Sequence, residues 1–107
     1  MSIKTILVKV TLEANTTIKQ LDKLVTPAGR TRRYKELRAY FSATGNAGII
    51  IKHQRDVIME IDPNEWNAHK LPYPMDEEVG GEDYLVIEGF NSESSDISVV
   101  LCFIYEE

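Results

Sequence analysis

The segment at residues 97–107, ISVVLCFIYEE, predicts a β-strand that is apolar on both faces. Successive side chains of a strand point to opposite faces of the sheet. One face of this strand would carry Ile97, Val99, Leu101, Phe103 and Tyr105, and the other would carry Val100, Cys102 and Ile104. Only one face can pack on the core of a small sandwich. The second apolar face therefore needs an explanation of its own.

We expect this second face to contact another copy of the chain. Antiparallel sheets usually alternate apolar and polar side chains, because one face meets water. Burying a Val or Ile side chain contributes about 1.5–3 kcal/mol to a contact. Val100, Cys102 and Ile104 are therefore predicted to lie in the interface of a homo-oligomer. In the alternative, the loop around Trp66 folds over this face within one chain.

The rest of the chain also predicts strands, because its apolar residues recur mostly with a period of two. In residues 4–13, Ile6, Val8 and Val10 share one face with Leu12. Two β-branched runs separated by a short turn indicate a hairpin. The predicted strand regions are residues 4–13, 15–25, 32–43, 48–54, 56–62, 83–91 and 95–107.

Three of the segments need separate interpretation. Residues 15–25 have helical spacing at Ile18, Leu21 and Val25, but their β-branched start favours a strand. Residues 65–83 form a long irregular stretch, in which prolines restrict the backbone to extended or edge conformations. The alternation in residues 32–43 favours a strand with Leu37, Ala39, Phe41 and Ala43 on one face and Tyr34, Glu36, Arg38, Tyr40 and Ser42 on the other. A helix would also bring Tyr34, Leu37 and Phe41 to one side.

These features predict an all-β fold with about eight short strands. Strands at regular spacing with turn signals between them are typical of an antiparallel β-sandwich or barrel. A chain of 107 residues can bury one hydrophobic core. We therefore expect a single domain over residues 1–107, built as a compact eight-stranded jelly roll.

Composition and charge narrow the class of protein. The net charge of −5 argues against nucleic acid as the main partner, because phosphate binding needs spare cations. No segment approaches the roughly 18–20 apolar residues of a membrane span. Residues 1–10 carry charges within their apolar run and do not resemble a signal peptide. We expect a protein that stays in the cytoplasm or is assembled there.

Charged residues concentrate in two islands. One interpretation is that both are solvated surface patches. The other is that they pair across a boundary between subunits, with Arg30, Arg32 and Arg33 of one copy meeting Asp76, Glu77 and Glu78 of the next. The basic island consists of Arg30, Arg32, Arg33, Lys35 and Arg38, and the acidic one of Asp76, Glu77, Glu78, Glu82 and Asp83.

No motif in the sequence predicts catalysis or a cofactor. There is no nucleophile elbow and no phosphate-binding glycine loop. Cys102 is the sole cysteine, and we expect a buried thiol that acts as a small hydrophobe. A metal-dependent enzyme using His53, Glu60 and His69 is the weakest of three functional hypotheses, since nothing in their spacing requires a metal site.

Two aromatic residues suggest a different class of function. Trp66 and Tyr73 lie in the long connection at residues 65–83. Exposed aromatic rings on the loops of a β-sandwich can stack on sugar rings. The alternative is that Trp66 covers one end of the core, as a lone tryptophan usually does. A carbohydrate-binding module using Trp66 and Tyr73 is therefore the second functional hypothesis.

The pattern of the second half resembles the closing strands of small viral jelly-roll proteins. A proline-bearing strand leads through the acidic, glycine-rich turn of "LPYPMDEEVGGED" into a strand of the type "YLVIEGFN". The polar loop "NSESS" then leads into the final apolar strand. The first half, "TLEANTTIKQL" and "RRYKELRAYFSATGNAGIIIKH", is compatible with the opening strands of such folds.

This resemblance implies a structural protein of a virion without catalytic residues, cofactor or metal. Coat-forming jelly rolls are generally longer, so the resemblance favours a minor capsid, vertex, decoration or attachment component. Its partners would be further copies of itself, with other virion proteins or a cell-surface glycan as additional candidates. The first functional hypothesis is therefore self-assembly into a virion, with assembly in the host cytoplasm.

Overall fold

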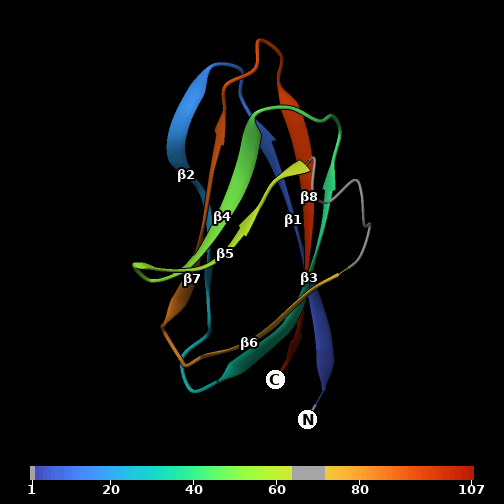
Figure 1. Cartoon of the computed structure of the whole chain (residues 1–107). Helices are drawn as coiled ribbons and strands as arrows, with labels where there is room; N and C mark the ends of the chain where they lie inside the picture. The colour runs from blue at the N-terminus through green and yellow to red at the C-terminus, as the bar shows by residue number, and fades with distance from the viewer. Residues whose placement is uncertain (1, 64–71) are drawn as a thin grey trace.

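The computed structural model describes residues 2–63 and 72–107, which form eight β-strands in two sheets (Figure 1). The first sheet has the strand order β1-β8-β3-β6 and the second has the order β2-β7-β4-β5. The strands are β1 (Ile3–Leu12), β2 (Thr16–Val25), β3 (Arg32–Phe41), β4 (Ala47–His53), β5 (Asp56–Ile61), β6 (Tyr73–Val79), β7 (Tyr84–Asn91) and β8 (Ile97–Glu106). The ambiguous segment at residues 15–25 is thus a strand.

The strand pairing follows that of one long hairpin rolled into a sandwich. β1 pairs with β8, β2 with β7, β3 with β6 and β4 with β5, all antiparallel. Further pairings of β3 with β8 and of β4 with β7 complete the two sheets. Eight strands in this order form a jelly roll. The predicted fold class, an antiparallel β-sandwich, is confirmed.

The core lies between the two sheets. The predicted inward face of β8 is confirmed, since Leu101 and Phe103 are 0 % exposed. From the second sheet, Ile49 and Ile87 are equally inaccessible. β-branched and aromatic side chains pack well on a pleated sheet, which is why these runs form the centre of the sandwich.

A β-bulge on β3 makes one sequence-based prediction wrong. Simple alternation puts Tyr34 on the face opposite Leu37, but Tyr34 is fully buried beside it. The register against β8 shifts between Tyr34 and Glu36, so that an extra residue returns Tyr34 to the inner face. Ala43 is also not inward, because β3 ends at Phe41 and Ala43 is exposed.

β6 lies at the edge of the first sheet, beside β3. The expected extended or edge conformation is confirmed for Tyr73–Val79, and Pro74 lies opposite Glu36 in this strand pair. Proline is tolerated at a sheet edge, because it lacks the N–H that an inner strand needs. Among the residues that the structure describes, no helix is long and apolar enough to cross a bilayer.

Candidate functional site

The outer face of the first sheet carries an apolar strip. Val100 lies between Lys9 and Tyr40, which are its partners on the neighbouring strands. Cys102 lies in the same way between Leu7 and Arg38. Directly opposite residues of a sheet share one face. We call the resulting surface the apolar strip and define it as Leu7, Tyr40, Val100, Cys102 and Ile104.

The strip is exposed chiefly at its flanks. Leu7 is 65 % exposed and Tyr40 is 48 % exposed. Val100, Cys102 and Ile104 are of intermediate exposure, since each has a cross-strand neighbour on both sides. The expectation of a buried thiol is therefore wrong for Cys102: the register of β8 turns it away from the core.

The alternative cover for this strip involves residues outside the described part of the chain. Trp66 belongs to residues 64–71, which the structure does not describe. Assignment of Val100, Cys102 and Ile104 to a contact between subunits stays a prediction. Leu7 and Tyr40 were not assigned to this surface from sequence, because the neighbours of β8 are known only once the sheet order is known.

The two charge islands meet within one chain. β3 and β6 are antiparallel neighbours, and Arg33 bridges two acidic side chains of β6. Its Nη1 lies 3.0 Å from Asp76 Oδ1, and its Nη2 lies 3.0 Å from Glu78 Oε1. Lys35 Nζ also lies 3.3 Å from Asp76 Oδ1. Hydrogen bonds from Arg33 and then from Lys35 lower the pKa of Asp76.

Other members of the basic island converge on Glu107. Arg30 Nη1 lies 2.8 Å from Glu107 Oε1, and Arg32 Nε lies 3.3 Å from its Oε2. Lys4 of β1 joins them at 3.1 Å. The hydrogen bond from Lys4, together with those from Arg30 and Arg32, lowers the pKa of Glu107 to about 2 against the opposing effect of desolvation.

These contacts give most residues of the two charge islands partners within the chain. They account for Arg30, Arg32, Arg33, Asp76 and Glu78 without a neighbouring subunit. A role for the same residues between subunits stays a prediction. The in-chain pairing was not visible in the sequence, because strand order decides which charged strands become neighbours.

His53 forms a three-residue cluster that the sequence did not suggest. Its Nδ1 lies 2.5 Å from Glu77 Oε2, and its Nε2 lies 2.6 Å from Asp83 Oδ2. Gln54 Nε2 donates to the other oxygen of Asp83 at 2.6 Å. Burial favours the neutral ring, but the hydrogen bonds to Asp83 and Glu77 outweigh it and raise the pKa of His53. An imidazolium between two carboxylates is the state that satisfies both nitrogens.

This cluster does not resemble the hypothesised metal centre. Both ring nitrogens of His53 are engaged by carboxylates, and Glu60 lies opposite Ile50 on the outer face of the second sheet. His69 lies outside the described residues. Within residues 2–63 and 72–107, no group of three or more His, Cys, Asp or Glu side chains is arranged to hold a metal ion.

The hypothesised sugar site is only half described. Tyr73 lies on β6 opposite Leu37 and packs against the core as a partly buried residue. Trp66 lies outside the described residues, so its position relative to Tyr73 is not part of the site geometry.

The chain matches no protein-family model, no curated protein and no solved structure.

Proposed function

We propose that this chain is a non-enzymatic structural protein that assembles with copies of itself through the apolar strip. The observation that carries the proposal is the outer face of β8, a strand with neighbours on both sides and apolar residues on both faces. A sheet face that meets only water gains nothing from Val100 or Ile104, whereas a second copy would bury them at about 1.5–3 kcal/mol each.

The surroundings of the strip suit a specific contact between copies. Arg38 and Glu36 pair beside it at 2.8 Å, and Lys9 lies at its other flank. A charged rim around an apolar centre is the usual anatomy of a protein interface. Two copies that meet face to face would use the same patch twice, as in a two-fold dimer.

A virion component is the form of this function that we favour. The jelly-roll strand order supports the resemblance to small viral jelly-roll proteins, and a minor capsid, vertex, decoration or attachment role suits the length of the chain. Genes for a packaging ATPase or a coat protein beside this gene would support a virion role. A gene neighbourhood devoted to metabolism would count against it.

Sedimentation of matched variants tests self-assembly. We expect the parent protein to sediment above its monomer mass of 12.2 kDa at micromolar concentration. Leu7→Asp should yield a folded monomer, because it places a charge in the strip without touching the core. Ile18→Asp is the control: Ile18 is similarly exposed, at 56 % against 65 %, but belongs to the opposite sheet.

The double variant Val100→Asp with Ile104→Asp provides a second test at the centre of the strip. Circular dichroism should show that it keeps its β-structure while it sediments as a monomer. A parent protein that is already monomeric at micromolar concentration would contradict the proposal. So would a Leu7→Asp variant that keeps the oligomer.

A further inference from the structure

Two adjoining grooves lie on the outer face of the second sheet, opposite the apolar strip. The larger has a volume of about 710 Å³ and opens widely to solvent. The smaller has a volume of about 360 Å³. Ile18 of β2 and Phe90 of β7 line both, so the two grooves form one continuous surface across β2, β7, β4 and β5.

Phe90 forms the floor between the grooves because of the residue opposite it. Phe90 pairs with Gly48 on β4, and a Cβ atom at Gly48 would lie 2.9 Å from a carbon of the Phe90 ring. The ring therefore occupies the space that the side chain of any residue other than glycine at position 48 would need. Ile18, 56 % exposed, lies beside a register shift of β2 between Thr16 and Lys19. The result is an accessible aromatic ring next to an accessible aliphatic side chain.

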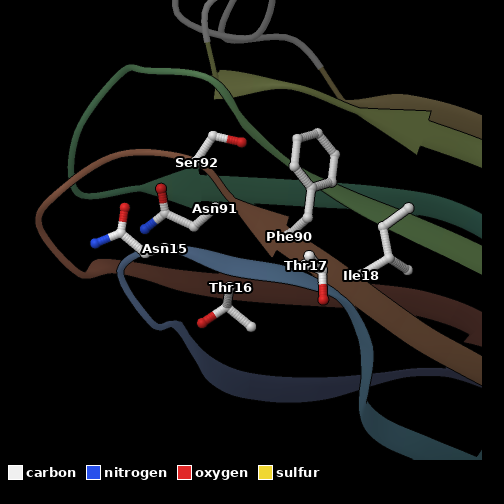
Figure 2. Close-up of a pocket in the computed structure, with 7 residues that line it drawn as sticks. All are labelled: Asn15, Thr16, Thr17, Ile18, Phe90, Asn91 and Ser92. Carbon is white, nitrogen blue, oxygen red and sulfur yellow. The ribbon is translucent and has the colours of Figure 1, made fainter.

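Polar groups surround this apolar floor. Figure 2 shows Phe90 and Ile18 on one side of the larger groove, and Asn15 and Ser92 on the other. Thr17 lies beside Phe90 and Ile18 in this view. Glu60 and Asp62 line the far end of the smaller groove. The rim therefore offers amide, hydroxyl and carboxylate groups.

Asn91 shapes this rim instead of contributing to it. Its side-chain amide donates to the carbonyl oxygens of Leu12 and Ser95, both at 2.9 Å, and its Oδ1 accepts from the Glu93 N–H. The side chain is fully buried. These three bonds tie the loop after β7 to the end of β1 and so fix the polar edge beside Phe90.

The charges of the grooves disfavour anionic ligands. Among the described residues that line them there is no Lys, Arg or His, and the two charged side chains are both carboxylates. A phosphate or a sialic acid would meet repulsion here without a compensating cation. A neutral sugar has an apolar C–H face for the Phe90 ring and hydroxyl groups for the amides and carboxylates of the rim.

We propose that this groove binds a neutral sugar residue of a glycan, with Phe90 as the stacking platform. The site differs from the one suggested for Trp66 and Tyr73. It also lies on the sheet opposite the apolar strip, so a chain that assembles through one face would present the sugar site on the other. Assembly and sugar binding are therefore separable by mutation.

The test uses a glycan array of neutral and sialylated glycans, followed by NMR titration of the full chain with methyl glycosides of glucose, galactose, mannose and N-acetylglucosamine. We expect signals from neutral glycans and shifts of the amide resonances of Ile18, Gly48 and Phe90. Phe90→Ala should weaken binding by roughly tenfold or more, and Phe90→Trp should retain it. Tyr84→Ala is the control, since it truncates an aromatic residue of the same strand outside the grooves.

Ile18→Asp gives an independent variant if Phe90→Ala does not fold. It should abolish sugar binding and keep the oligomer, whereas Leu7→Asp should do the reverse. Three results would overturn the inference: no neutral glycan that shifts these resonances, binding restricted to sialylated glycans, or unchanged affinity in Phe90→Ala. Loss of binding in Trp66→Ala alone would instead assign the sugar to the Trp66 region.

Discussion

His53 Nδ1 lies 2.5 Å from Glu77 Oε2, and this contact joins the two sheets of the sandwich. His53 ends β4 in the second sheet, whereas Glu77 belongs to β6 at the edge of the first. Asp83, in the turn before β7, holds the other ring nitrogen at 2.6 Å. One protonated histidine thus links three separate segments at one end of the molecule.

The His53 cluster predicts that stability falls as the pH rises above about 6.5 and through the raised pKa of His53. The pKa of His53 is raised in the folded protein, while an unfolded histidine titrates near about 6.5. Its contribution is therefore fully present below about pH 6.5 and is lost as the pH rises through the raised value. Urea unfolding at about pH 6 and about pH 9 should show this loss in the parent protein and little of it in His53→Gln.

The second histidine provides the control for this experiment. The chain contains two histidines, so His69→Gln leaves His53 as the one that titrates. This variant should keep the pH dependence of the parent. An unchanged dependence in His53→Gln would show that the link between the sheets does not depend on the imidazolium. Glu77→Gln should weaken the effect, because it removes one of the two carboxylates that face the ring.

Two tyrosines of one strand give a matched test of the bulge. Tyr34 is 0 % exposed and Tyr40 is 48 % exposed, although simple alternation would put both on one face. Tyr34→Ala should lower the free energy of unfolding by about 3–5 kcal/mol, as expected for a buried aromatic side chain. Both variants are compared in the monomeric Leu7→Asp background, where no second copy covers Tyr40, and there Tyr40→Ala should change the free energy of unfolding much less than Tyr34→Ala. Equal effects in chemical denaturation would contradict the bulged register.

The bulge also shows where the sequence stops predicting the fold. Alternation identified the inner faces of β1 and β8, since neither strand has an insertion against its partner. The same pattern failed at Tyr34, because one extra residue reverses every side chain before it and leaves no mark in composition. The turn at Gly45 was predictable, because the run SATGNAG is rich in residues that tolerate positive φ, whereas the turn at Asn15 was not, since residues 15–25 were interpreted as one strand.

The candidate sites depend on pairings that the sequence could not supply. Val100, Cys102 and Ile104 were identified from β8 alone, whereas Leu7 joins them through the order of the sheet. Glu77 lies 24 residues from His53 in the chain, with no motif to connect them. The groove at Phe90 likewise requires the partner Gly48, whose small size matters only once β4 and β7 are neighbours.

We expect the stability of the folded protein to show a second pH dependence, at acidic pH, because of Glu107. Its pKa is lowered to about 2 by Lys4, Arg30 and Arg32. A depressed carboxyl pKa stabilises the folded state above the unfolded value of about 4.3, and this contribution is lost as the pH falls towards 2. Glu107→Gln should therefore be less stable than the parent at neutral pH, and the difference should shrink in thermal unfolding near about pH 2.5.

We expect the stability of the edge strand β6 to depend on Arg33. It bonds to both Asp76 and Glu78 on β6, so Arg33→Glu would place three like charges side by side. We expect faster hydrogen exchange of the β6 amides, with the inner strands unaffected. The added change Asp76→Lys should restore protection. If Arg33→Glu instead dissociates an oligomer while β6 stays protected, the charge islands act between subunits and not within the chain.

Cys102 reports directly on the apolar strip. Its thiol is partly exposed in a single chain, on the same face as Leu7 and Val100. A polar maleimide should therefore label the folded Leu7→Asp monomer readily, because the thiol is accessible there. In the parent protein at micromolar concentration, the second copy should cover Cys102 and slow the labelling. Dilution should then restore the fast rate, since it dissociates the oligomer.

Ile18→Asp should label as slowly as the parent. Equal labelling rates in all three proteins at every concentration would mean that no second copy covers this strip.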